Sequence, residues 1–592
     1  MSKHPLFDLI VGFESASGSE VKGKRFVSKE VTGRVTGSVQ SRFIERMTQG
    51  AQRFADLVSY TSTRTYGLLL VGFGLLTLVL HFVKDYLGFA DKLTLPVVLI
   101  GALFAMIAIP LLSFDKPTAI AMQEFALTDW IFFEFFCIQR MHKKNTAESI
   151  HPIIGLLLGL MLAVVGAIVP VWYVAIGMGV AVYLYLALIS PEFSFFFTFL
   201  AMPYLPMASG SEAILAILVA ITVISFVRKI AEGKRIYYFE QYDLFLLLLL
   251  ATVFVNGVVT GGTESIPSSL VMLSLGFGGY ALTGSLVANR RLADCVIKAN
   301  IISSLPVSVI AIIQYMNALL SGGMDQFDGS SGTFDSPDML AAFLLVPSAF
   351  MLYFVIARRN KGMKALYAIY LFVTLVAMAT TLRAWVIVSV LAGILAYFAL
   401  KSGNASGLWL GAIGFLPYLA LFIPDDWLLS FRDNPIVSFI GFDEYLATWV
   451  ESKALFVDNL FFGVGTGDFM DAPYSANFLL QIGLEAGVLV LFLFVAIFIV
   501  RLRHRSIYAP YIRSSEVGLI SSFAEITAIA MLVYGLFTSL WAEPAVYYLF
   551  WCVFGLGSAV LRISKREFDD RVGYFSDGAG IDASSIDISL RH

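Results

Sequence analysis

The sequence predicts an all-α fold: a polytopic integral membrane helix bundle of about 12–16 transmembrane helices with one long extracytoplasmic loop. Hydrophobic residues make up 58% of the 592 residues and charged residues only 14%, and the mean hydropathy is +0.81. The chain therefore holds far more apolar runs of about 20 residues than a soluble core could bury. Glycine recurs inside these runs, as transmembrane helices allow because neighbouring helices cover the backbone.

The apolar runs give roughly sixteen candidate spans, although runs divided by Pro170 or Pro191 could instead be re-entrant segments. In chain order the candidates are 66–84, 93–113, 152–169, 171–189, 193–209, 212–227, 243–260, 268–286, 299–317, 339–357, 364–381, 384–400, 405–423, 475–500, 518–541 and 544–562. An even number of spans puts both termini on the same side of the membrane.

The distribution of basic residues predicts the orientation. The Lys- and Arg-rich loops on the side of the termini are 140–151, 228–242, 287–298, 358–364 and 501–513. Cytoplasmic loops carry an excess of Lys and Arg, so we expect both termini in the cytoplasm. The loops on the opposite side, which carry Asp and Glu but almost no Lys or Arg, are 258–267, 317–338 and 424–474.

The two ends of the chain are polar. Residues 1–62 lack the apolar core of a signal peptide and predict a cytoplasmic tail with an interfacial helix near 40–60. The membrane domain covers 63–562, and its aromatic stretch 129–136, broken by charge, suits a second interfacial helix. Residues 563–592 are too poor in apolar side chains to fold alone and predict a disordered cytoplasmic tail.

Several kinds of site are not indicated by the sequence. The three cysteines lie far apart and predict neither a disulfide framework nor a metal site. The Gly-rich run 463–467 lacks the preceding strand and βαβ unit of a nucleotide-binding loop. The outer loops are too acidic for nucleic acid, and we expect no metal and no cofactor.

Arg383 departs from the predicted charge pattern. It follows the apolar stretch 378–382, where the chain is expected to reach the outer face, whereas the dense basic clusters fall inside. An anionic ligand would explain a cation at this place. The alternatives are a side chain that reaches to the membrane interface and a charge paired with Asp335 or Asp338.

Four segments in order resemble a known family. Ser331–Ala342 is similar to its "GTF-x-NPN-x-LA" helix start, Thr381–Ala384 to its "T-x-SR-G/A" element, Trp449–Phe469 to its "W…GVG-x-G-x-F" loop, and Asn477–Gly487 to its "HN-x-x-LQ-x-x-x-E-x-G" helix start. The family is the O-antigen ligase and O-antigen polymerase superfamily of bacterial envelope glycan enzymes. The resemblance covers about 330–490.

The resemblance implies metal-independent transfer of a glycan from a polyprenyl diphosphate to an acceptor hydroxyl, at the outer face of the cytoplasmic membrane of a bacterium. The implied partners are the polyprenyl-diphosphate-linked glycan, membrane lipids and other glycan assembly proteins. Arg383 matches the family's arginine and would bind two diphosphate oxygens in a fork geometry. A polymerase is favoured over a ligase, because Ala476 stands where the ligase histidine would be.

Two departures from the family pattern affect the expected site. Tyr445 and Leu446 occupy the region of a second family arginine, which leaves Arg432 and Lys453 as substitutes. No outer loop contains a histidine, so a carboxylate would have to activate the acceptor hydroxyl. Asp338 could instead cap the helix that is expected to begin at Met339.

The residues expected at the site fall into two groups. The predicted catalytic residues are Arg383, Glu444, Asp468 and Asp471, with Glu451, Asp335 and Asp338 as further candidates for the base. The predicted substrate-binding residues are Arg432, Lys453, Asp335, Asp338, Asn477, Gln481 and Glu485. For each acid, a solvated loop position or a helix cap is the alternative interpretation.

Two other function classes stay open. A catalytically silent relative that acts in glycan assembly would fit the lost arginine and histidine. A transporter or flippase would fit the many spans, although the sequence has neither clearly repeated halves nor a series of charges near mid-membrane.

The predicted topology can be tested by labelling. A cysteine introduced as Asp471→Cys should react with a membrane-impermeant maleimide in cells from which the outer barrier has been removed, because loop 424–474 is expected outside. The parent protein, with Cys137, Cys295 and Cys552, serves as the control. Labelling only after lysis would show that loop 424–474 lies in the cytoplasm, opposite to the prediction.

Overall fold

The computed structural model describes residues 50–51, 53–88, 94–136, 150–208, 210–231, 237, 241–261, 266–401, 423–430, 432, 434, 443–465, 477–514, 517–540 and 543–579. It is 85% helical, without strands among these residues, which confirms the all-α prediction. Ten of the described helices are long and apolar enough to cross a membrane, and four shorter apolar helices accompany them. These helices are typical of a multi-pass membrane protein. The predicted span 405–423 lies almost entirely outside the described residues.

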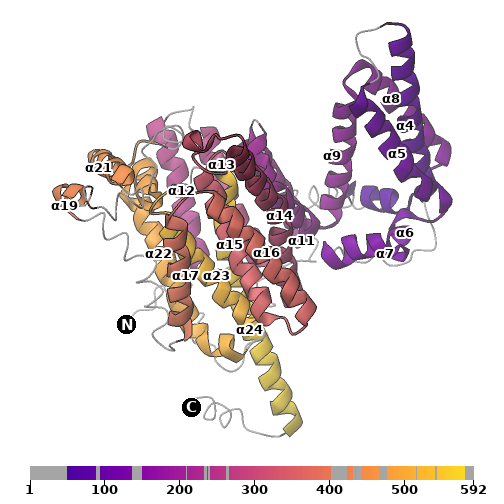
Figure 1. Cartoon of the computed structure of the whole chain (residues 1–592). Coiled ribbons are helices and arrows are strands. Elements are labelled where there is room, and N and C mark those ends of the chain that lie inside the picture. The colour runs from indigo at the N-terminus through magenta and orange to yellow at the C-terminus, as the bar shows by residue number, and fades with distance from the viewer. Residues whose placement is uncertain are drawn as a thin grey trace. The chain divides into compact units, whose positions relative to one another are not determined.

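The chain divides into two compact units. The first comprises Met1–Ser194 and Ile224–Ile236, and the second comprises Phe195–Val223 and Tyr237–His592. Figure 1 labels helices of both units.

The first unit is built around α4, which packs against α5 and α8. Its apolar helices are α4 (Thr63–Tyr86), α5 (Leu95–Ser113), α8 (Pro152–Ile168) and α9 (Val171–Ile189). Gly155 and Gly159 of α8 lie directly against α4. A Cβ on Gly155 would lie 2.2 Å from the Thr65 carbonyl oxygen, and one on Gly159 would lie 2.1 Å from that of Leu69. Glycine four residues apart thus lets two helix backbones touch, as small residues do at membrane helix interfaces.

Short helices complete the first unit. They are α6 (Thr118–Glu124), α7 (Ala126–Thr128) and the π-helix η1 (Asp129–Phe135). The aromatic stretch predicted as a helix is therefore helical, and Trp130 stacks on Phe135 with ring centroids 6.2 Å apart. Residues 53–60 are also helical, within the range predicted for the N-terminal helix.

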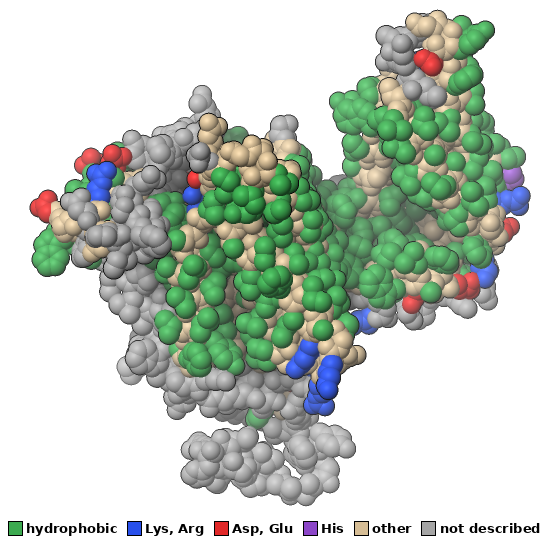
Figure 2. All heavy atoms as spheres, viewed as in Figure 1, with side chains coloured by type: hydrophobic (Ala, Val, Ile, Leu, Met, Phe, Trp, Pro, Cys, Tyr) green, Lys and Arg blue, Asp and Glu red, His purple; other side chains and the backbone are tan. Residues whose placement is uncertain are grey.

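The second unit is the larger helix bundle (Figure 1). Its main helices are α12 (Gln241–Gly261), α13 (Ile266–Leu286), α14 (Arg290–Leu320), α15 (Pro337–Ala357), α16 (Lys361–Thr380), α17 (Trp385–Lys401), α22 (Phe478–Ser514), α23 (Gly518–Tyr534) and α24 (Pro544–Ala579). The smaller elements are the 3₁₀ helix η3 (Met324–Gln326) and helices α19 (Asp425–Ser430) and α21 (Asp443–Asp458). The apolar part of α24 is fully buried, and it packs against α13, α22 and α23. Figure 2 shows hydrophobic side chains covering the exposed flanks of the bundle.

Helices α10 (Pro191–Ala201) and α11 (Ser211–Ala231) contribute residues to both units. The single span predicted at 193–209 is wrong in its length. The α-helix ends at Ala201, and the 3₁₀ helix η2 (Met202–Met207) follows. Pro203 and Pro206 lie in this segment and cannot donate the backbone hydrogen bonds that would continue an α-helix.

Helices of the bundle extend into the predicted loops 287–298 and 501–513 and into the predicted C-terminal tail. Helix α14 begins at Arg290, α22 continues to Ser514, and α24 continues to Ala579, beyond the boundary expected at residue 562. The basic cluster at 501–505 is therefore not a solvated loop. Arg501 is fully buried, and its Nη2 lies 2.7 Å from Oε1 of Glu525 on α23. A buried partner on another helix allows the arginine to stay inside the bundle.

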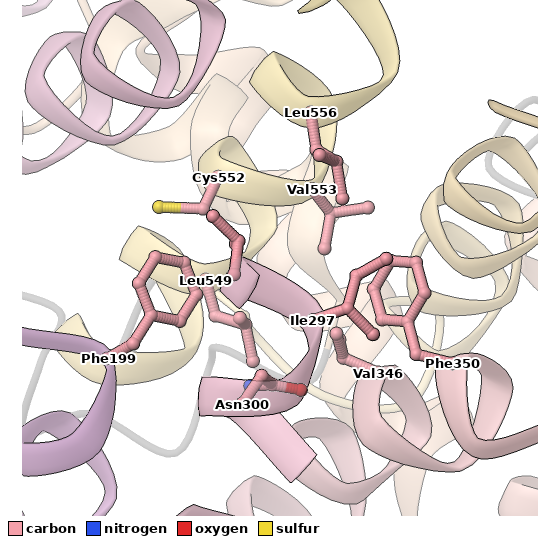
Figure 3. A pocket seen from close by; sticks show the side chains of 10 residues that line it. Phe199, Ile297, Asn300, Val346, Phe350, Leu549, Cys552, Val553 and Leu556 are labelled. Carbon is pink, nitrogen blue, oxygen red and sulfur yellow. The ribbon is translucent and has the colours of Figure 1, made fainter. Parts of the chain in front are cut away.

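A small cavity lies in the second unit between α10, α14, α15 and α24 (Figure 3). Its volume is about 10 Å³, about the space that one water requires. Asn300 is its one polar lining residue, only 2% exposed. Neither amide atom of Asn300 has a hydrogen-bond partner among the described residues. Such unpaired groups typically cost about 1–3 kcal/mol each.

We predict that Asn300→Leu raises the midpoint of thermal unfolding of the detergent-purified protein, because it removes two unpaired polar atoms from an apolar cavity. Ile297→Ala, on the same cavity wall, is the matched control. It should lower the midpoint, since it enlarges the cavity at a cost of about 2–5 kcal/mol. A lower midpoint for Asn300→Leu would mean that the amide is hydrogen-bonded in the membrane.

Candidate functional site

Arg383 lies on the connection between α16 and α17. The opposite end of α16 carries Lys361 and Lys364, next to Arg358 and Arg359. A helix of 20 residues is about 30 Å long, which is the thickness of the hydrocarbon core. The geometry of α16 therefore separates Arg383 from this basic cluster by a full membrane thickness.

The turn before Arg383 has an unusual backbone. Leu382 has φ 57°, and it is the one non-glycine residue with a positive φ in the described part of the chain. This left-handed conformation costs a branched residue such as leucine roughly 1–2 kcal/mol. The surrounding hydrogen bonds hold it, because Leu382 N donates to Ala379 O and Val386 N donates to Arg383 O. The start of the Arg383 side chain is therefore fixed between two helix ends.

Two carboxylates surround the guanidinium. Nη1 and Nη2 of Arg383 donate to the two oxygens of Asp328, over 3.1 and 2.8 Å, in a bidentate fork. Nε lies 3.2 Å from Oδ2 of Asp338. The alternative interpretation in which Arg383 pairs with Asp338 is confirmed, whereas Asp335 is exposed and is not among the described partners of Arg383. The sequence analysis missed Asp328.

The pKa of Arg383 reflects opposing effects. Burial lowers it, but the hydrogen bonds to Asp328 and the negative charges of Asp338 and Asp328 outweigh burial and raise it above its ordinary value. An arginine is already protonated throughout the physiological range. The two carboxylates therefore stabilise the protonated, positively charged form of Arg383.

Asp338 holds the arginine rather than capping a helix. The residue that caps α15 is Ser336, whose hydroxyl accepts a hydrogen bond from Met339 N, so the cap predicted for Asp338 is wrong. Oδ1 of Asp338 accepts from Trp385 Nε1 over 3.1 Å and from the Tyr534 hydroxyl over 3.4 Å. Its carboxylate thus connects α15, α17 and α23 at one point.

The segment 327–333 places Asp328 beside the arginine. Ser330 N donates to Thr380 O over 2.9 Å, and the Ser330 hydroxyl donates to Ala311 O over 2.8 Å. Gly329 has φ 118°, and a Cβ there would lie 2.2 Å from the Thr381 carbonyl oxygen. Only glycine allows this close approach, so backbone pairing with the end of α16 brings Asp328 to Arg383.

The long loop between α17 and α22 also reaches this place. Tyr445 of α21 contacts Trp385 edge-to-face, with ring centroids 4.8 Å apart, and Phe537 stacks on Trp385 at 5.6 Å. The Arg383 Cζ lies 5.7 Å from the centre of the Trp385 ring. A cation next to an aromatic cluster is further stabilised by the ring faces. Tyr445, which stands where the resemblance implies a second arginine, therefore belongs to the surroundings of Arg383.

The Gly-rich run of this loop has a structural role. Helix α22 breaks at Gly487, with φ 81° and ψ 175°. Val464 N donates to Leu484 O over 2.7 Å, and Gly465 N donates to Glu485 O over 3.1 Å. A Cβ on Gly463 would lie 2.5 Å from the Leu484 carbonyl oxygen. The glycine thus permits close packing of a loop backbone on a broken helix.

Asn477, Gln481 and Glu485 lie in the interior next to this break, each at most 1% exposed. The Asn477 side-chain oxygen accepts from Leu480 N over 3.0 Å, and Gln481 Nε2 donates to Glu485 Oε1 over 2.8 Å. The structure brings Gln481 and Glu485 together but gives no described contact with Arg383. Their role in substrate binding stays a prediction.

The other predicted residues are spread over the loop. Lys453 pairs with Asp425 over 2.7 Å and donates to Ile423 O, and Arg432 is exposed beyond α19. Neither has a described contact with Arg383. Glu444 belongs to α21, next to Tyr445, and its side chain is not described. Asp468 and Asp471 lie outside the described residues.

Glu543 is a buried carboxyl group that the sequence analysis did not select. It directly precedes Pro544, the first residue of α24, and is 6% exposed. Its pKa is raised to about 7, mainly by burial and further by the negative charges of Asp335 and Glu212. The sequence signal that could have identified Glu543 is its position directly before Pro544, the first residue of the last predicted span.

No family model matches the sequence, and no curated protein matches it. Within the described residues, no group of three or more His, Cys, Asp or Glu side chains is placed to hold a metal ion.

The raised pKa of Glu543 predicts a pH-dependent stability. The contribution of the protonated carboxyl to folding stability is fully present below pH 4.5, the ordinary pKa of a glutamate. This contribution is lost as the pH rises through about 7, because burial opposes ionisation of the folded protein. Glu543→Gln should therefore raise the thermal midpoint at pH 8 and change it little at pH 5. The exposed Asp426→Asn is the control and should change neither. Equal effects of Glu543→Gln at both values would contradict a titrating carboxyl.

Proposed function

We propose that the protein transfers a glycan from a polyprenyl diphosphate to an acceptor hydroxyl at the outer face of a bacterial cytoplasmic membrane, as a polymerase rather than a ligase. The observation that carries the proposal is the fixed guanidinium of Arg383 at the end of α16 opposite the basic cluster. The proposal requires the orientation predicted from the charge pattern.

The chemistry of a diphosphate leaving group suits this guanidinium. Negative charge grows on the diphosphate as the glycosyl bond breaks, and a positive group positioned beforehand stabilises that charge. Asp338 forms an ion pair with Nε from the protein side, over 3.2 Å and without a hydrogen bond, while Nη1 and Nη2 donate to the exposed carboxylate of Asp328. Two nitrogens in a plane match two phosphate oxygens, which an ammonium group does not reproduce.

The acceptor hydroxyl would need a base. With no histidine in the outer loops, the remaining candidates are carboxylates. The predicted catalytic ones are Glu444, Asp468 and Asp471, and the further candidates are Glu451, Asp335 and Asp338. Glu444 is adjacent in sequence to Tyr445, which contacts Trp385 beside the arginine.

A catalytically silent role in glycan assembly is the second candidate. It is favoured by the surroundings of Lys453, whose ammonium is tied to Asp425 and Ile423 O and so does not replace the second family arginine beside Arg383. A purified protein that transfers no glycan, while its loss still disturbs glycan assembly in cells, would support this role.

We predict that Arg383→Ala abolishes polymer formation from a lipid-linked glycan by the purified protein. Loss of one such donor typically costs roughly 3 kcal/mol, on the order of a hundredfold in rate. Arg383→Lys should rescue poorly, because it lacks the fork. The exposed Arg359→Ala is the matched control and should keep its activity.

The arginine variant leaves Asp338 without its ion-pair partner, so folding must be checked by the thermal midpoint. The double variant Arg383→Gln with Asp338→Asn removes both charges and should fold while remaining inactive. Normal polymer length from a folded Arg383→Ala protein would reduce Arg383 to an interfacial anchor.

A further inference from the structure

Asp328 occupies the same two nitrogens of Arg383 that the proposed diphosphate would use. We propose that Asp328 is an internal competitor for this anion site, and that its carboxylate must leave the guanidinium before a diphosphate can bind. This inference rests on the proposed function and specifies how access to the site is regulated.

The two carboxylates on Arg383 differ in how firmly they are held. The Asp338 side chain is 16% exposed and also accepts hydrogen bonds from Trp385 and Tyr534. The Asp328 side chain is 77% exposed, and Arg383 is its one hydrogen-bond partner in the described part of the chain. Asp338 is therefore the permanent partner, and Asp328 is the one that an incoming anion can displace.

The backbone next to Asp328 keeps its carboxylate near the Arg383 guanidinium. Ser330 N donates to Thr380 O, and Gly329 lies directly against Thr381 O. The chain at this point need not move, because rotation of the Asp328 side chain alone would free the fork. The released carboxylate enters water, where its charge is solvated, so displacement costs little beyond the ion pair itself.

The charge of the ligand decides the exchange. Asp328 offers one negative charge on two oxygens, whereas a diphosphate that joins two groups carries a negative charge on each phosphate. Both bind a guanidinium in the fork geometry. The tethered carboxylate reduces the fraction of protein with an open site, and it lowers the apparent affinity of any anion by that fraction.

Binding of farnesyl diphosphate to the full-length protein in detergent, measured by calorimetry, tests the inference. Asp328→Asn should bind about two- to fivefold more tightly than the wild type, the factor expected for loss of an exposed ion pair. Asp328→Ser should show the same gain. Asp458→Asn, which removes an exposed carboxylate from the end of α21, is the matched control and should bind as the wild type does.

Further variants separate competition for the fork from general charge repulsion. In an Arg383→Lys background, Asp328→Asn should give a smaller gain, because no fork remains to be occupied. An equal gain there would assign the effect to charge repulsion and overturn the inference. Unchanged or weaker binding by both Asp328 variants, with normal thermal midpoints, would also overturn it.

The same assay tests the proposed function independently. Arg383→Ala should lose binding of farnesyl diphosphate. If a folded Arg383→Ala protein binds as the wild type does, the proposed anion site fails and the inference fails with it. If Arg383→Ala loses binding and Asp328→Asn shows no gain, only the competitor role is wrong.

Discussion

The hydrocarbon interior of a membrane offers no hydrogen-bond partners, and the structure of the larger unit depends on this constraint. Arg501 is buried inside the bundle, where it pairs with Glu525 on α23 and contacts the ring of Phe554, whose centre lies 3.8 Å from the guanidinium carbon. Gly557 leaves room for this guanidinium, since a Cβ there would lie 1.9 Å from Arg501 Nη2 and the arginine would have to shift. One buried cation therefore dictates residues on α22, α23 and α24.

The side chain of Arg383 is also largely shielded, at 16% exposed, but its two ion-pair partners differ from each other. Its inner side is held by Asp338, which Trp385 and Tyr534 position, whereas its outer side is held by an exposed carboxylate. Arg501 is enclosed on all sides and serves the bundle. The contrast between these two arginines distinguishes a structural ion pair from one that can exchange partners.

Hydropathy and charge asymmetry were sufficient to predict the fold class and to select Arg383, because both signals are local in sequence. Asp328 was missed because it pairs with Arg383 across 55 residues, through a backbone contact at Gly329 that leaves no periodic pattern. The cluster at Arg501 was predicted as a loop because charge usually ends an apolar run, and its partner Glu525 lies on another helix. Pairing in three dimensions is what the sequence alone could not supply.

The break in α22 has a consequence for motion. Leu484 and Glu485 carbonyls accept from Val464 and Gly465, and Val488 N donates to Leu460 O over 2.8 Å. Moving residues 460–465 away from α22 would break these three backbone hydrogen bonds. The three groups of α22 would then lack partners beside a largely apolar interior, at about 1–3 kcal/mol each. Residues 460–465 are therefore expected to stay in place on α22. Any hinge in the long loop between α17 and α22 must lie before residue 460 or after residue 465.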